Sequence, residues 1–257
     1  MHSSLYNPMK QFAFSAGLFA LAASVPAYSL ESQLSCLLEP SQHISLSSQV
    51  PGVVKSVSVE RGERVNKGQP LIELENGVER ASLETAKARA DFSARKIERN
   101  RNLLEQQLLA DYERDEMMTE QQLAQLAVHE AEVRLAQRTI LSPVAGLVTK
   151  RHVQVGEYVG TDPVLELVTL DPLYAEIVMR AEAYGHIHKG MQLDIDIFGN
   201  TMVRKKAKVR IVDQTIDAAS GTFGAQLELS NPRSALPSGL KCQLHLDIEQ
   251  NAKPDAQ

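Results

Sequence analysis

The side chains best suited to chemistry in this chain are a close histidine pair and a methionine doublet. His186 and His188 stand two positions apart, a spacing at which two side chains do not share a helix face. No cysteine or carboxylate cluster near them completes the ligand set of a metal site. Met117 and Met118 would suit a soft metal ion, but one doublet inside a helical pattern is more typical of packing. The sequence therefore predicts no metal site.

The chain also has no pattern that is typical of an enzyme. Asp194 and Asp196 alternate along a predicted strand, so we expect both carboxylates to face solvent. No glycine-rich phosphate loop occurs, and no nucleophile stands at a fitting distance from a base. We predict a non-catalytic protein without a cofactor.

Cys36 and Cys242 are the two cysteines of the 257-residue chain. Each lies in a strand-like stretch, and no nearby pattern would supply a base, so a catalytic thiol is not expected. A disulfide requires Cα atoms within about 7 Å, which a sequence does not show. Two alternatives stay open: a Cys36–Cys242 disulfide, or two unrelated buried thiols.

The N-terminus has the parts of a secretory signal peptide, which we predict at residues 1–29. Lys10 precedes an apolar run at 12–23, and small residues follow at Ala27 and Ser29. The run is shorter than the about 20 apolar residues that a membrane span needs. The alternative is an uncleaved N-terminal anchor. We expect export to the periplasm, an oxidising compartment in which a disulfide persists.

Composition argues against a nucleic-acid partner. The formal net charge is -5, whereas nucleic-acid binding normally leaves a basic footprint. Tryptophan is absent and aromatic residues make up only 5%, so stacking on bases is not expected.

One pattern recurs 94 residues along the chain without a gap. The matched positions are Gly52 with Gly146, Val54 with Val148, Val59 with Val153, Gly62 with Gly156, Val65 with Val159 and Leu71 with Leu165. Such self-similarity indicates like structural units. Alternating valines and glycines at the joints predict short strands with tight turns in each copy. If those turns need positive φ, a valine at Gly52 or Gly146 should disrupt the unit.

Residues 77–140 separate the two copies and have the composition of a helix. Proline is absent, and glycine does not occur after Gly77. Apolar residues repeat at intervals of seven, as in helices that supercoil: Leu83, Ala90, Ile97 and Leu104, then Met117, Ala124 and Ala131. With a break near 110–111, the pattern predicts two antiparallel arms at 78–109 and 112–139, with Asp111 as the N-cap of the second.

A second row on the later arm contains Leu126, Val133 and Ile140. Two interpretations stay open for this row. It is either a surface for a neighbouring subunit or the wide side of a single seam.

Strand patterns flank these parts on both sides. Residues 34–50 predict a first strand, and five or six short strands follow between Leu173 and Ile248. Strands at this spacing predict a small closed barrel or sandwich. The polar residues 251–257 predict a disordered tail. The predicted fold class is mostly β with a long α-helical hairpin.

This order of parts closely resembles the periplasmic adaptor family, the HlyD-like membrane fusion proteins of tripartite efflux pumps. The resemblance covers about residues 35–250. It rests on Val50-Pro-Gly-Val-Val through Leu71, on Leu141-Ser-Pro-Val-Ala-Gly-Leu-Val through Val159, and on Asn231-Pro-Arg-Ser-Ala-Leu-Pro-Ser-Gly239.

The resemblance implies a division into modules. A split lipoyl-like (barrel-sandwich hybrid) domain would occupy 34–76 and 141–170, a coiled-coil hairpin 77–140, and a small C-terminal β-barrel 171–250. Turns at 74–77, 140–143 and 169–172 would join these modules.

The resemblance also implies partners. Members link an inner-membrane transporter, here RND in preference to ABC type, to an outer-membrane channel, and they commonly form hexameric rings. Many members flank the hairpin tip with an arginine, a leucine four residues on and a serine seven further. Arg99 and Leu103 match, whereas Ala110, next to Asp111, stands at the serine position. The departure leaves open a scaffold with a different periplasmic partner.

A carrier of biotin or lipoate is a further alternative, because lipoyl-like domains elsewhere bear the cofactor on a lysine between their halves. In this chain residues 77–140 occupy that joint, and Lys87 and Lys96 fall mid-helix. We therefore expect no swinging arm.

Overall fold

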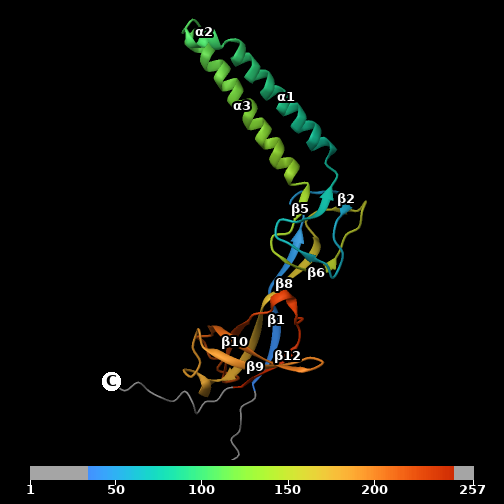
Figure 1. Ribbon diagram of the computed structural model, residues 1–257, viewed down its shortest axis with the longest axis vertical. Helices are drawn as coiled ribbons and strands as arrows, with labels where there is room; N and C mark the ends of the chain where they lie inside the picture. Colours follow the sequence, from blue (N-terminus) through green and yellow to red (C-terminus); the bar gives the residue numbers. More distant parts are fainter. Residues whose placement is uncertain (1–33, 246–257) are drawn as a thin grey trace, which may run out of the picture. The chain divides into compact units, whose positions relative to one another are not determined.

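Two hydrophobic cores enclosed by β-strands, together with a pair of long helices, make up residues 34–245, the part of the chain that the structure, a computed structural model, describes (Figure 1). The predicted signal peptide at 1–29 and the predicted tail at 251–257 lie outside these residues. Strands outnumber helices in the described part, as the sequence predicted.

The first core forms from the two copies of the repeat. Its strands are β2 (Gly52–Val57), β3 (Arg64–Val65), β4 (Pro70–Leu74), β5 (Thr139–Leu141), β6 (Gly146–Arg151) and β7 (Tyr158–Val159). The matched apolar positions of both copies are buried in one cluster: Val54 and Val148, Val59 and Val153, Val65 and Val159, Leu71 and Leu165. Matched residues thus build a shared interior, and neither copy encloses a core of its own.

The two copies also exchange equivalent backbone hydrogen bonds. The Gly62 N–H donates to the Val148 carbonyl at 2.8 Å, and the Gly156 N–H donates to the Val54 carbonyl at 2.8 Å. The returning bonds match as well, from Val148 N–H to the Glu63 carbonyl at 2.9 Å and from Val54 N–H to the Glu157 carbonyl at 2.8 Å. Because buried backbone groups need partners, each half depends on the other to satisfy its strand.

The second core lies inside a closed ring of strands. Its members are β1 (Leu34–Ser47), β8 (Pro163–Arg180), β9 (Gln192–Phe198), β10 (Met202–Val212), β11 (Thr222–Leu229) and β12 (Lys241–His245). The order is β1-β12-β9-β10-β11-β8, and an additional pairing of β1 with β8 closes it. Closure removes the unpaired edges that an open sheet would leave.

Cys36 on β1 and Cys242 on β12 are directly opposite each other in this ring. Their Cα atoms are 4.8 Å apart, and the side chains form a disulfide. Both residues are buried in the second core.

Strands β1 and β8 run through both cores as a continuous antiparallel pair. The turn predicted at 169–172 is therefore wrong, because β8 extends without interruption from Pro163 to Arg180. A register shift between Pro40 and Gln42 of β1 lies opposite this stretch. An irregularity of this kind bends a strand pair without ending it, which is how the chain passes from one core to the next.

A buried asparagine secures the connection to the last strand. Asn231 is 1% exposed, and its side-chain amide donates to the carbonyls of Leu170 and Leu236, each at 2.8 Å. Its carbonyl oxygen accepts the Leu236 N–H at 2.9 Å. The side chain thus fastens the loop after β11 to the middle of β8.

Three helices follow β4: α1 (Gly77–Arg99), the short α2 (Arg101–Glu105) and α3 (Asp111–Ala136). The helices α1 and α3 lie antiparallel and side by side (Figure 1), joined by ion pairs from Lys96 to Glu120 at 2.8 Å and from Lys87 to Glu132 at 3.8 Å. The predicted first arm is too long, since α1 ends at Arg99, where the Asn100 side chain donates to the Lys96 carbonyl. None of the helices within residues 34–245 is both long and apolar enough to cross a membrane.

The seam between α1 and α3 contains smaller side chains than the sequence predicted. Its most buried members are Ala86, Ser93, Met117 and Ala131, whereas Leu83 and Ile97 are only half-buried. The expected second row divides, because Leu126 and Val133 are exposed whereas Ile140 belongs to β5 and is buried in the first core. The row is therefore not the wide side of the seam.

Candidate interaction sites

The four glycines singled out from the repeat serve two purposes. Gly62 and Gly156 both have φ of +89°, a conformation that favours glycine, and open space surrounds them. Gly52 and Gly146 do not have positive φ, so the condition set for them from the sequence is not met. An added Cβ at Gly146 would lie 2.6 Å from the Val168 carbonyl oxygen, so close backbone packing excludes a side chain there.

Gly52 forms part of the joint between the first core and the helices. An added Cβ there would lie 2.8 Å from a guanidinium nitrogen of Arg138. That guanidinium donates to the Pro51 carbonyl at 2.9 Å and pairs with Glu79 of α1 at 2.7 Å. Arg138 thus connects the base of α1 to the turn before β2.

Sequence reasoning did not single out Arg138. Its partners lie 59 and 87 positions away, so no local spacing marks it. The one local signal is its position directly before β5, where a helix has just ended.

The predicted contact residues lie at or near the far end of the helices. Arg99 ends α1, Leu103 lies in α2, and Ala110 precedes α3, which begins at Asp111. Leu103 is 41% exposed, and Leu108, which the sequence did not single out, is 66% exposed. Both apolar side chains are exposed near this end of the helices and so are available for a contact.

Asp111 does not cap α3, contrary to the prediction. No side chain accepts a hydrogen bond from the free N–H groups there, and Ala110 occupies the cap position. The Asp111 carboxylate instead pairs with Arg114 at 3.1 Å, one turn along the helix. It still lies at the positive end of the helix dipole.

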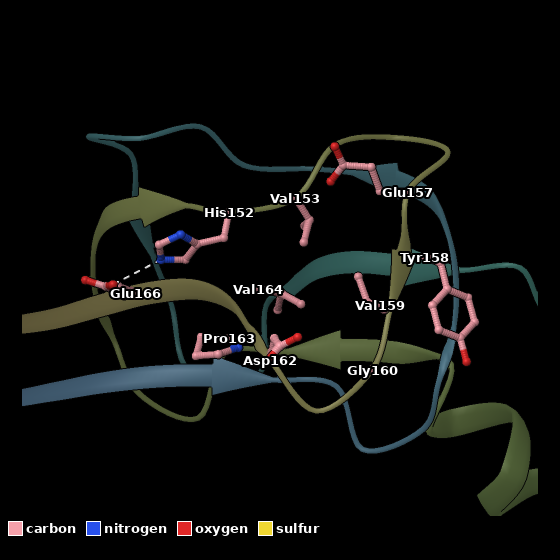
Figure 2. A pocket seen from close by; sticks show the side chains of 10 residues that line it. All are labelled: His152, Val153, Glu157, Tyr158, Val159, Gly160, Asp162, Pro163, Val164 and Glu166. Atoms are coloured by element: carbon pink, nitrogen blue, oxygen red, sulfur yellow. Dashed lines mark hydrogen bonds and ion pairs between the residues drawn. The ribbon is translucent and has the colours of Figure 1, made fainter.

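A hollow of about 460 Å³ opens beside β7 and the start of β8 (Figure 2). At one side His152 points toward Glu166, with its Nε2 3.0 Å from the carboxylate, and at the other Tyr158 is 72% exposed. Lys150 also donates to Glu166 at 3.2 Å, and His43 lies 3.6 Å away. The hydrogen bond from Lys150, followed by that from His152, lowers the pKa of Glu166 below its ordinary value.

These contacts make Glu166 a link between strands. His43 lies on β1, Lys150 on β6 and Glu166 on β8, so one carboxylate holds three neighbouring strands together. Within residues 34–245, no three His, Cys, Asp or Glu side chains are grouped so as to hold a metal ion.

The second core carries a charged cluster that the sequence placed wrongly. Asp194 is exposed as expected, but Asp196 is 4% exposed. Arg204 donates to both of its carboxylate oxygens, at 2.7 and 2.8 Å, and His245 lies 2.6 Å from one of them. The Arg204 hydrogen bonds are the main reason that the pKa of Asp196 is held far below its ordinary value.

Comparison with known proteins identifies the domain that contains the first core. Residues 42–169 match the family model of the CzcB-like barrel-sandwich hybrid domain. The chain is a relative of the periplasmic adaptors, the membrane fusion proteins. The resemblance predicted from the sequence is thereby confirmed, as is a mostly β fold with a barrel-sandwich hybrid domain.

Two curated relatives illustrate the range of this adaptor family. The cation efflux system protein CzcB of Alcaligenes sp. is 27% identical over 205 residues, which cover 74% of this chain and 39% of that protein. The antibiotic efflux pump periplasmic linker protein ArpA of Pseudomonas putida is 19% identical over 242 residues, covering 88% of this chain and 65% of that protein. The chain therefore spans between 39% and 65% of the length of these two relatives.

A solved structure supports the fold. A MacA-MexA chimeric protein that contains the Pseudomonas aeruginosa MexA α-hairpin domain superposes with a TM-score of 0.71. It is 19% identical, and the match covers 83% of this chain and 80% of that one.

Proposed function

We propose that this chain is the adaptor subunit of a tripartite efflux system, a structural and non-catalytic protein that links an inner-membrane transporter, RND type in preference to ABC, to an outer-membrane channel. One observation carries the proposal. The two halves of the repeat are joined through α1 and α3, between which α2 and the following loop expose Leu103 and Leu108. The names of two relatives, a cation efflux system protein and a periplasmic linker protein, support it.

Each module has a geometric task in this proposal. The proposed division assigns residues 34–76 with 141–170 to the lipoyl-like domain, 77–140 to the coiled-coil hairpin and 171–250 to the β-barrel, to which the first residues of β1 also contribute by pairing with β12. The 26 residues of α3 span about 39 Å, which sets the reach of the hairpin toward the channel. The signal peptide at 1–29 exports the chain to the periplasm, where its partner holds it at the inner membrane.

Copies of the adaptor assemble into a ring, with six members as in the family. Contacts between unlike surfaces close into rings when the rotation between copies completes a circle. A ring places several tips around one channel, so weak single contacts add up.

The channel contact consists of Arg99, Leu103, Ala110 and Asp111 at the tip. Leu103 supplies apolar area, and Arg99 supplies up to five donors for carbonyl or carboxylate partners. Ala110 provides no hydroxyl, so the contact lacks the hydrogen bond that a serine would give. The carboxylate of Asp111, 88% exposed at the next position, is available to accept one.

The alternative is a scaffold whose tip binds a different periplasmic protein. The absence of a hydroxyl at Ala110 favours it. A test of the main proposal therefore has to identify the partner.

Photo-crosslinking in the native cells does so, with a photoreactive residue in place of Leu108 at the tip or of Val178 on the barrel, which is 64% exposed. We expect mass spectrometry to find an outer-membrane channel bound to the first and an inner-membrane transporter to the second. The identity of the transporter separates RND from ABC. A probe at Glu84, exposed in the first half of α1 and away from the tip, is the matched control.

Adducts of Leu108 with soluble periplasmic proteins alone would overturn the bridging role and favour the scaffold. Equal capture of the channel from Glu84 and from Leu108 would overturn the assignment of the tip.

A further inference from the structure

Helix α3 carries an apolar face on the side away from its seam with α1. This α3 outer face contains Tyr112, Thr119, Leu123, Leu126 and Val133, spaced at intervals of three, four and seven. Its apolar members are between 45% and 74% exposed. The surface hollows between Tyr112 and Leu123, beside Glu116 and Glu120. A stripe of this spacing and width on a helix normally packs against another helix.

Helix α1 carries a matching stripe on its own side away from the seam. This α1 outer face contains Val78, Ala81, Ala88, Phe92, Arg95 and Arg99, all exposed. Phe92 is 52% exposed and Val78 is 80% exposed. The helix pair therefore has two free edges, each with the spacing of a helix contact.

The charges of the two helices are complementary. α1 has six Lys or Arg residues and four Asp or Glu residues. α3 has seven Asp or Glu residues and two Lys or Arg residues. Contact between two α3 faces, or between two α1 faces, would oppose like charges, whereas α1 against α3 brings opposite charges together.

The pairing inside one chain gives the register of a contact between copies. Lys96 lies level with Glu120, and Lys87 lies level with Glu132. A neighbouring copy that points in the same direction would therefore set its Phe92 level with Leu123 and Leu126. It would also set its Arg99 level with Glu116.

We propose that the α3 outer face of one copy binds the α1 outer face of the next, with Phe92 packed between Leu123 and Leu126 and with Arg99 paired to Glu116. This inference rests on the proposed adaptor function and names the surface by which its ring closes. The contact joins unlike faces, so it repeats from copy to copy. Apart from Arg99, which also belongs to the proposed tip contact, it uses residues that neither the seam nor the tip occupies.

Paired cysteines in the full chain test the contact. The variant F92C/L126C places thiols on opposite outer edges of one helix pair, so an oxidant joins them only between copies. We expect a ladder of covalent oligomers on non-reducing gels after mild oxidation in the native cells. The single variants F92C and L126C should give no ladder, and a mixture of the two should give dimers that contain one copy of each.

The matched control is A94C/L126C. Ala94 is exposed and lies two residues from Phe92, about 200° around α1, so its thiol points away from the neighbour. Charge reversal is a second arm: E116R should reduce the yield of the F92C/L126C ladder several-fold, and adding R99E should restore it.

A ladder from A94C/L126C, dimers from L126C alone, or the absence of any ladder would each overturn the proposed contact. The two proposals fail separately. Channel capture at Leu108 without a ladder leaves the adaptor function standing, whereas a ladder without channel capture leaves the contact standing and removes the bridge.

Discussion

An added Cβ at Gly146 would lie 2.6 Å from the carbonyl oxygen of Val168, which belongs to the backbone of β8. We expect G146A to lower the free energy of unfolding by about 1–3 kcal/mol, because overpacking against a backbone atom outweighs the gain from a stiffer unfolded chain. Thermal unfolding followed by circular dichroism measures the change.

The control for G146A is G160A, in the same module. An added Cβ at Gly160 meets nothing within 4 Å, so this variant should be neutral or slightly more stable. Equal melting temperatures for both variants would show that close approach does not select glycine at residue 146.

Asp196 shows how a strand pattern can be right about direction and wrong about burial. Residues 194 and 196 do share a face, as alternation requires. The cover over Asp196 comes from Arg204 on β10 and His245 on β12, which are 8 and 49 positions away. Only the register between strands brings these residues together, and a single sequence does not contain that register.

The same cluster predicts a dependence of stability on pH. Because Arg204 holds the pKa of folded Asp196 far below the unfolded value of about 3.9, the carboxylate stabilises the fold fully above that value. This contribution is lost as the pH falls through the acid range below about 4. We expect D196N to melt at a lower temperature than the wild type at pH 7 and to lose less stability between pH 5 and pH 3.

Melting curves of D196N, of the wild type and of D194N, which changes an exposed aspartate on the same strand, provide the comparison. A D196N curve parallel to the wild-type curve throughout the acid range would contradict the assigned role of Asp196.

At the scale of elements, the sequence predicted the helical residues better than it predicted which of them pack in the seam between α1 and α3. Intervals of seven correctly placed Met117 and Ala131 in the seam. They missed Ala86 and Ser93, the most buried residues of α1, because small side chains carry a weak hydrophobic signal. The larger side chains of Leu83 and Ile97 carry a stronger hydrophobic signal, although they are only half-buried.

The joint between helices and strands depends on Arg138. Its guanidinium is 23% exposed, and its partner Glu79 is 15% exposed, so water screens the pair less than an open surface pair. We expect R138Q to cost about 1–3 kcal/mol, because Glu79 and the Pro51 carbonyl both lose a charged donor. Hydrogen exchange should show faster opening of the first two turns of α1.

R134Q is the matched control for this joint. Arg134 pairs with Glu130 one turn along α3, and both side chains are more than 60% exposed. Such a pair contributes about 0.3–0.5 kcal/mol. Protection of α1 that falls equally in R134Q and R138Q would argue against a special role for Arg138.

For the whole molecule, the repeat predicted the first core because its matched residues are encoded in order along the chain. The closure of the second core was not predictable in the same way. It requires β1 to pair with both β12 and β8, and β12 begins more than 190 residues after β1 ends. Alternation identifies strands, but it does not say which strands become neighbours.

The Cys36–Cys242 disulfide fixes one of these distant pairings. It closes a loop with a sequence separation of 206, which contains both cores and the helices. Closing a long loop restricts the unfolded chain, and removal of such a bond typically costs about 2–5 kcal/mol.

We therefore expect a thiol reductant, added to the partly unfolded protein so that it reaches the buried sulfurs, to lower the melting temperature of the wild type by several degrees. The double variant C36A/C242A should melt at the lower temperature and should not respond to the reductant. A wild type whose melting is insensitive to reductant, together with two thiols titrated after denaturation without it, would show that the bond does not form and that strand pairing alone closes the barrel.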